Sequence, residues 1–333
     1  MGASELRGRG LWGGAAWASG LVLLLALVLL VSHVGEGRRL GELLLHAFAE
    51  HPFWLLAAIA LQAGTYVCAA GVWQRALDAS REPRRLRDLV PLGLAKLFAD
   101  QALPSAGLSG TLLVVRALHK RGVPRGVAIG AMVTGLVSFY AAYGLATGLS
   151  LVVLLERREL HRALVALAAA FSLLAVGVPF ALLWLRGQEE PRVPRWLLRV
   201  PGAEEVRDAI AEAPRESLWG TRLGVETVAL QLGVFALDAA TLAVMLHAVG
   251  SDVSPGLAFA SFVLASVVAT LAWVPGGLGT FEGTCVGMLR LHGVSLEAAL
   301  AAVLLLRGFT FWLPMAPGLW IARREMARTR QVA

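Results

Sequence analysis

The sequence predicts an all-α polytopic membrane protein with about six spanning helices plus two opposed re-entrant helical hairpins in an inverted repeat. The first observation is composition: 57% of the 333 residues are hydrophobic, 16% are charged, and the mean hydropathy is +0.68. Soluble domains usually carry about 25% charged residues. The second observation is a series of apolar runs that reach the roughly 20 residues needed to span a bilayer. The third is an internal repeat of two broken apolar segments.

Six apolar runs have the length and composition of spanning helices. The first run follows Arg7 and Arg9 and is long for a signal peptide, so we expect a retained helix. Cys68 and Cys285 both lie in apolar stretches, which argues against a disulfide framework. The whole chain, 1–333, is therefore predicted to be a single integral membrane domain. The six runs lie at about 15–34, 52–74, 126–154, 162–185, 223–249 and 297–321.

Two further apolar segments, 89–121 and 257–292, do not fit this count. Each contains a helix-like run, a break rich in Pro and Gly, and a second helix-like run. The breaks are LPSAGLSG at 103–110 and VPGGLGTFEG at 274–283. One half of each segment is too short for an untilted crossing. We therefore expect each segment to enter the membrane and return to the same side as a re-entrant hairpin.

The two broken segments belong to an internal repeat. An offset of 171 residues places Pro104 on Pro275, and an offset of 169 places ALQAG (60–64) on ALQLG (229–233). Three predicted crossings separate the two hairpins, and an odd number inverts the second copy. Inverted repeats with broken helices are common in secondary transporters. Repeat one is predicted at 52–154 and repeat two at 223–321.

The basic residues predict the orientation of the chain. With both hairpins re-entrant, the two termini and the loops 75–88, 120–125 and 186–222 share one side and carry 21 Lys and Arg residues. The other side carries six. The positive-inside bias then places both termini in the cytoplasm. Loop 186–222 has a proline-rich entry and a polar helix at about 203–213, so it is predicted to be a cytoplasmic amphipathic connector.

The second break has the composition of a substrate path. Broken backbone at membrane depth must be buried in protein or line a water-filled cavity. Proline removes a backbone donor, and glycine permits conformations closed to other residues. The freed N–H and C=O groups can then face a substrate. The residues that break the two hairpins are Pro104, Pro275, Gly276, Gly277 and Gly279.

A carboxylate and a guanidinium accompany the second break. Glu282 is expected near the start of the second half-helix, where the helix dipole favours an anion. Arg307 lies about one third into the last predicted helix and is the natural partner of this acid. Intramembrane charges are costly and usually face a cavity or a partner. A salt bridge that only holds the hairpin is the alternative interpretation.

Other polar residues within apolar segments extend the candidate substrate path. Asp238 and Gln231 are seven residues apart, which places them on one helix face. Lys96 and Asp100 are four apart and can pair on a helix. The candidate path residues are Glu282, Arg307, Asp238, Pro275, Gly276, Gly277, Gly279, Pro104, Lys96, Asp100, Arg116 and Gln231.

These motifs resemble a known family. VPGGLGTFEG followed by LHGVSLEAALAAVLLLRGFTFWLP resembles the C-terminal signature of the lysylphosphatidylglycerol synthase transmembrane-region family, also called flippase-like integral membrane proteins. LPSAGLSGTLLVVRALHKRGVP is similar to its N-terminal signature. Many members carry an acid and an arginine shortly after that Pro-Gly turn, where this chain has Ser109 and Leu112, with Arg116 one turn later. The second signature is matched at Pro275, Gly276, Gly277, Gly279, Glu282, Gly293 and Arg307.

The resemblance implies flippase-like translocation of a lipid between leaflets of a bacterial plasma membrane. The lipid is a phospholipid, an aminoacylated phospholipid, or an isoprenoid lipid or glycolipid. Bifunctional members carry a following soluble domain that transfers the aminoacyl group. Because this chain stops at Ala333, soon after the last predicted helix, we expect translocation without synthesis.

Two other classes of function remain open from the sequence. One is an ion- or proton-coupled transporter of a small solute, which would share every feature above. The other is a membrane-embedded lipid-modifying enzyme, for which the sequence offers no nucleophile–base or metal set. We therefore predict no catalytic residues, no metal and no cofactor. The predicted partner is a membrane lipid rather than a nucleic acid, and a homo-oligomer is left open.

Overall fold

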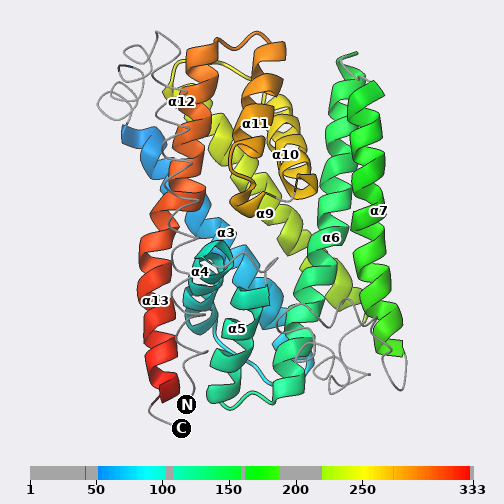
Figure 1. Ribbon diagram of the computed structural model, residues 1–333, viewed down its shortest axis with the longest axis vertical. Coiled ribbons are helices and arrows are strands. Elements are labelled where there is room, and N and C mark those ends of the chain that lie inside the picture. The colour runs from blue at the N-terminus through cyan, green and yellow to red at the C-terminus, as the bar shows by residue number, and fades with distance from the viewer. Residues whose placement is uncertain are drawn as a thin grey trace, which may run out of the picture.

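The computed structural model describes residues 42, 52–102, 108–158, 162–187, 220–272 and 274–330. All regular structure in these ranges is helical (Figure 1). The helices are α3 (Pro52–Ala79), α4 (Leu86–Ala102), α5 (Leu108–Lys120), α6 (Arg125–Glu156), α7 (Arg162–Gly187), α9 (Thr221–Ala248), α10 (Pro255–Leu271), α11 (Thr280–Leu291), α12 (Leu296–Arg307) and α13 (Leu313–Arg330). The predicted helices at 15–34 and 203–213, and Pro104, lie outside the described residues.

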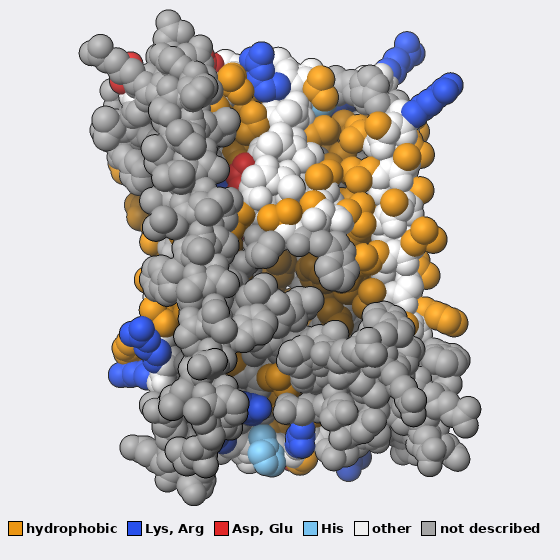
Figure 2. Space-filling model, viewed as in Figure 1, with side chains coloured by type: hydrophobic (Ala, Val, Ile, Leu, Met, Phe, Trp, Pro, Cys, Tyr) orange, Lys and Arg blue, Asp and Glu red, His pale blue; other side chains and the backbone are white. Residues whose placement is uncertain are grey.

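Five of the six predicted spanning helices are confirmed as helices long and apolar enough to cross a membrane. The outward side of α7 illustrates the lipid-facing surface, since Leu173 is 79% exposed and Phe180 is 66% exposed. Figure 2 shows hydrophobic side chains over α6 and α7, with Lys and Arg side chains toward the two ends of the molecule. The five spans are Pro52–Ala79, Arg125–Glu156, Arg162–Ala181, Thr221–Ala248 and Leu296–Glu325.

Helices α3 and α9 lie against each other in opposite directions through the centre of the molecule (Figure 1). The Trp54 and His247 rings are 5.7 Å apart at one end of the pair. Arg75 and Glu226 form an ion pair at the other end, with Nε and Oε2 3.6 Å apart. A β-carbon on Gly64 would lie 3.1 Å from a side-chain carbon of α9. The small glycine surface therefore lets the two helices approach closely.

Two pairs of shorter helices occupy opposite halves of the molecule. Helices α4 and α5 pack together in the lower half of Figure 1, and α10 and α11 pack together in the upper half. Helix α4 also packs on α13, where a β-carbon on Gly318 would lie 2.6 Å from the Leu94 carbonyl oxygen. Helix α10 also packs on α6 and α9. The shorter helix of each pair, α5 with 13 residues and α11 with 12, is too short for an untilted crossing, as the sequence predicts.

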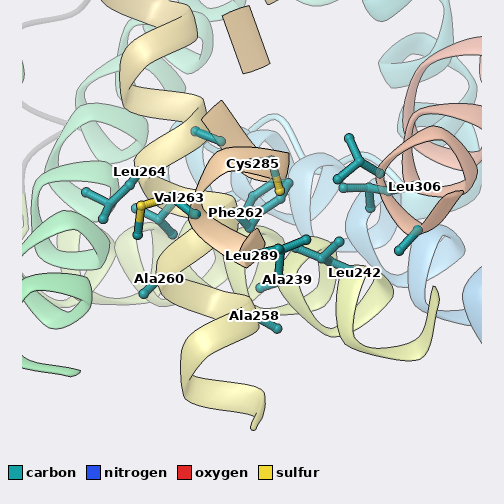
Figure 3. Packing of buried hydrophobic residues seen from close by; sticks show 14 of the residues in the cluster. Ala239, Leu242, Ala258, Ala260, Phe262, Val263, Leu264, Cys285, Leu289 and Leu306 are labelled. Atoms are coloured by element: carbon teal, nitrogen blue, oxygen red, sulfur yellow. The ribbon is translucent and has the colours of Figure 1, made fainter. Parts of the chain in front are cut away.

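The largest apolar cluster surrounds α10 (Figure 3). Val263 and Leu264 of α10 are fully buried, as are Cys285 and Leu289 of α11. The same cluster includes Leu242 of α9. Because α10 has neighbours on most sides, its sequence is apolar all round, without the one-sided pattern of a surface helix. The second half-helix pair is therefore held in a close-packed environment.

Candidate functional site

The site begins at the interruption of helical structure between α10 and α11. Residues Pro275–Gly277 form a single 3-10 turn between these helices. Gly276 and Gly277 have φ angles of 66° and 63°, in the left-handed region that glycine adopts at little cost. A β-carbon on Gly277 would lie only 2.7 Å from the Ala269 Cβ. The break therefore requires glycine for both backbone conformation and space.

Glu282 lies in the first turn of α11, as the sequence predicts. Its Oε2 accepts a hydrogen bond from the Gly279 N–H at 2.6 Å. Its Oε1 accepts one from Arg307 Nε, also at 2.6 Å. The carboxylate thus satisfies a free N–H at the start of a helix and a buried cation at once. The predicted pairing of Glu282 with Arg307 is confirmed.

Arg307 connects the end of α12 to the break and to the start of α11. It is the last residue of α12, and its Nη2 donates to the Gly276 carbonyl oxygen at 2.7 Å. Its guanidinium carbon lies 4.7 Å from the Phe311 ring centroid and 5.2 Å from that of Phe281. Its side chain is 13% exposed. The Arg307 guanidinium therefore contacts the backbone of the break, the Glu282 carboxylate and two aromatic rings. Cation–π attraction to the rings stabilises this arrangement.

Three features of this site are absent from the sequence predictions. Phe281 and Phe311 flank the guanidinium. A π-helical turn, Gly308–Trp312, also follows Arg307 directly, within the helix predicted at 297–321. The four-residue spacing from Arg307 to Phe311 was an available signal, since it puts both on one helix face. The π turn had no such signal, and turns of this kind are frequent at functional sites.

The first half-helix pair contains its own acid and cation. Lys96 Nζ and Asp100 Oδ2 are 2.5 Å apart on α4, which confirms the predicted pairing. Asp100 Oδ1 accepts a hydrogen bond from the Gly110 N–H at 2.8 Å, at the start of α5. A β-carbon on Gly110 would lie 2.5 Å from that same Oδ1. The close fit leaves no room for any larger residue. Arg116 lies further along α5 with an exposed side chain.

The first half-helix pair, α4 and α5, also contacts the second break. Gln101, next to Asp100 in α4, places its Oε1 2.9 Å from where a β-carbon on Gly276 would be. The end of α4 and the break after α10 are therefore in contact. Gln101 is one of the polar residues of the first broken apolar segment, 89–121. Its approach to Gly276 brings polar groups of both half-helix pairs to one place.

Asp238 and Gln231 reach different helices, although their spacing predicts a common face. Gln62 of α3 donates from Nε2 to Asp238 Oδ1 at 2.9 Å and to Thr241 Oγ1 at 3.0 Å. Gln231 donates to the Gly135 carbonyl oxygen of α6 at 3.4 Å. The buried amide of Gln62 therefore joins α3 to α9.

The fold and this cluster define a multi-pass helical membrane protein with a largely buried ion pair at a helix break. The chain belongs to the family described as lysylphosphatidylglycerol synthase TM region, which it matches over residues 13–318. This match confirms the resemblance of the two motifs over nearly the whole chain. A membrane, lipid-related role is consistent with that family. No curated protein is found to match the chain.

Proposed function

We propose that this protein moves a lipid between the two leaflets of the membrane and does not modify it chemically. The observation that carries the proposal is the Arg307 cluster, in which a cation, an acid and a broken backbone meet within apolar helices. Charged groups at membrane depth are expensive and commonly mark a path for polar cargo. A lipid headgroup is polar cargo that must cross this same apolar region.

The arrangement of the helices supports an inverted repeat with two re-entrant hairpins. In the first half, α3 packs on α4 and α6, and in the second half α9 packs on α10 and α12. Each short pair also packs on a long helix of the other half, α4 on α13 and α10 on α6. Two such halves can rock against each other around a site between them. This motion would expose the site to one leaflet and then to the other.

Arg307 is the proposed headgroup contact. Its guanidinium presents a planar set of donors that suits a phosphate as well as a carboxylate. In the structure, Glu282 accepts the hydrogen bond of the Nε donor. A lipid phosphate entering the site would replace Glu282 as the acceptor, while the Gly276 carbonyl keeps the guanidinium oriented. Because the phosphate replaces the Glu282 carboxylate directly, the Arg307 guanidinium keeps an anionic partner while the lipid enters.

A leaflet-resolved assay tests this proposal. The purified protein is placed in vesicles with fluorescent phosphatidylglycerol, its lysyl ester or an isoprenoid phosphate, and a membrane-impermeant reductant then bleaches the outer-leaflet label. We expect at least one lipid to redistribute with the wild type and not in protein-free vesicles. The variant Arg290→Gln changes an exposed arginine of α11 and serves as the matched control for Arg307→Gln. Redistribution of none of the three lipids would overturn the proposal.

A further inference from the structure

The acid between α3 and α9 differs from the two acids at the helix breaks. Asp100 and Glu282 each have a basic side chain and a backbone N–H as partners. Asp238 instead has a neutral partner, the amide of Gln62. Among the described residues, no Lys, Arg or His lies within ion-pair distance of Asp238. Its negative charge is therefore the least compensated of the three.

The position of Asp238 makes this charge costly. It lies ten residues before the end of α9 at Ala248, or about 15 Å at 1.5 Å per residue. The hydrocarbon core of a bilayer is about 30 Å thick, so a carboxylate at this distance from the helix end lies well inside it. Ionised groups in such surroundings are strongly penalised unless a cation accompanies them. A protonated, neutral Asp238 avoids this penalty.

The partner of Asp238 suits both of its protonation states. As placed, the Gln62 NH₂ donates to an ionised carboxylate. After a rotation that exchanges its O and N atoms, the Gln62 carbonyl accepts a hydrogen bond from a protonated carboxyl group. The Thr241 hydroxyl accepts from Gln62 and donates to the Leu237 carbonyl oxygen at 2.9 Å, and it can turn its donor to the Gln62 carbonyl after the same rotation. A lysine or arginine has no acceptor and would hold the acid ionised.

The helices packed around α9 place few ionisable groups near Asp238. From α3, the phenol of Tyr66 interacts electrostatically with Asp238. From α6, Tyr143 packs its ring on Phe235, about one turn from Asp238. Helix α10 contains no ionisable side chain. In α12, Glu297 and Arg307 stand at opposite ends, and Arg307 is already bound to the acid of α11.

We propose that Asp238 is a proton-binding site that couples lipid translocation to the transmembrane proton gradient, an inference that rests on the proposed flippase function. The Asp238–Gln62 hydrogen bond joins the first helices of the two halves at their contact. The carboxylate takes a proton from one side of the membrane, and the neutral acid releases it to the other side. The change in charge and in donor direction alters the bond between the halves that must move.

An infrared titration tests the proton site without any lipid substrate. The purified full chain is titrated in lipid nanodiscs, and the carbonyl stretch of protonated carboxyl groups is followed. We expect a band that titrates in the wild type, is absent in Asp238→Asn, and is also absent in Gln62→Lys, which places a cation beside the acid. Glu226→Gln changes an acid near the start of α9; it is the control and should keep the band. An unchanged band in Asp238→Asn would overturn the proposal.

A gradient experiment tests the coupling. Vesicles with labelled phosphatidylglycerol or its lysyl ester are given a pH difference across the membrane. With one proton per lipid, each pH unit shifts the leaflet ratio by up to about tenfold, because about 1.4 kcal/mol is a factor of ten. We expect this shift in the wild type and a gradient-independent ratio in Asp238→Asn. A wild-type ratio that ignores the gradient would overturn coupling alone. Failure to move any lipid would count against the proposed function, and the infrared band would still judge the proton site.

Discussion

The two half-helix pairs use the same local solution at their breaks but different connections to the rest of the molecule. In both, a carboxylate accepts a hydrogen bond from a backbone N–H at the start of the second half-helix, 2.8 Å for Asp100 and 2.6 Å for Glu282. In both, a basic side chain pairs with that carboxylate. Lys96 comes from the same helix as its acid, whereas Arg307 comes from another helix, 25 residues along the chain.

This difference predicts different consequences when each cation is removed. The Lys96–Asp100 pair is half-buried and local, and helical pairs with this four-residue spacing contribute only about 0.3–0.5 kcal/mol. Arg307 also holds the Gly276 carbonyl and lies beside two aromatic rings. Similar ion pairs at the two breaks therefore have different roles: Lys96–Asp100 stabilises one helix locally, and Glu282–Arg307 connects separate elements. Two halves with related helix order need not contribute equally to stability or function.

The largest effect is expected at Arg307. Arg307→Gln leaves Glu282 without its cation, and an unpaired buried charge typically costs about 3–5 kcal/mol. We expect Glu282→Gln and Arg307→Gln to insert into the membrane but to lose lipid redistribution, measured in the vesicle assay together with thermal unfolding in detergent. Wild-type redistribution by both variants would contradict a role in the path. Failure of both to insert would instead indicate a structural bridge.

A charge exchange sharpens the same comparison. The double variant Glu282→Arg with Arg307→Glu keeps a pair but moves the cation to α11, away from the Gly276 carbonyl. If Arg307 contacts the headgroup, this double variant should remain inactive although it is more stable than either single charge reversal. Recovery of lipid redistribution would show that pairing alone matters. The measurements are the vesicle assay and the thermal midpoint of each variant.

The next largest effect is expected at the second break. Gly277→Ala forces a β-carbon into a left-handed backbone conformation, which costs about 1–3 kcal/mol, and against Ala269 at 2.7 Å. We expect a lower thermal midpoint in detergent. Gly283→Ala is the matched control, because a β-carbon there meets no atom within 4 Å and alanine favours a helix. An equal loss in both variants would contradict a specific requirement at the break.

A smaller effect is expected at Lys96. Lys96→Gln removes the local pair of the first break but leaves the hydrogen bond from Gly110 to Asp100 in place. The expected loss is about 0.3–0.5 kcal/mol, which gives a small change in thermal midpoint and retained lipid redistribution. A loss as large as that of Arg307→Gln would mean that the two breaks are equivalent. Lys96 would then connect separate elements, as Arg307 does.

The smallest effect on the protein is expected from cysteines that report the side on which each pair opens. Ser80 directly follows α3, in the connection to α4, and Ser254 lies just before α10. With both pairs re-entrant and inverted, Ser80→Cys should react with an impermeant thiol reagent from the cytoplasm only, and Ser254→Cys from outside only. The wild type is the control, since Cys285 is buried and Cys68 is partly buried. Labelling of both positions from the same side would contradict the inverted arrangement.

Local properties of the sequence determined much of this protein. Run length and hydropathy located five of the spanning helices, because crossing a bilayer sets a minimum apolar length. The Pro-Gly composition located the second break, since few other residues adopt its backbone angles. Helical spacing predicted the Lys96–Asp100 pair, and the scarcity of intramembrane charge left Arg307 as the partner of Glu282. Each of these inferences depends on neighbours in the chain or on the cost of charge in lipid.

Only the tertiary structure decided which distant groups meet. Gln62 and Asp238 are 176 residues apart, and their hydrogen bond exists because α3 and α9 run against each other in opposite directions. The same is true of Gln101 beside Gly276, and of Gln231, which reaches α6 rather than the neighbours of Asp238. Helical periodicity states which residues share a face but not which helix that face meets. That choice depends on how whole apolar surfaces pack together, and no single stretch of sequence contains it.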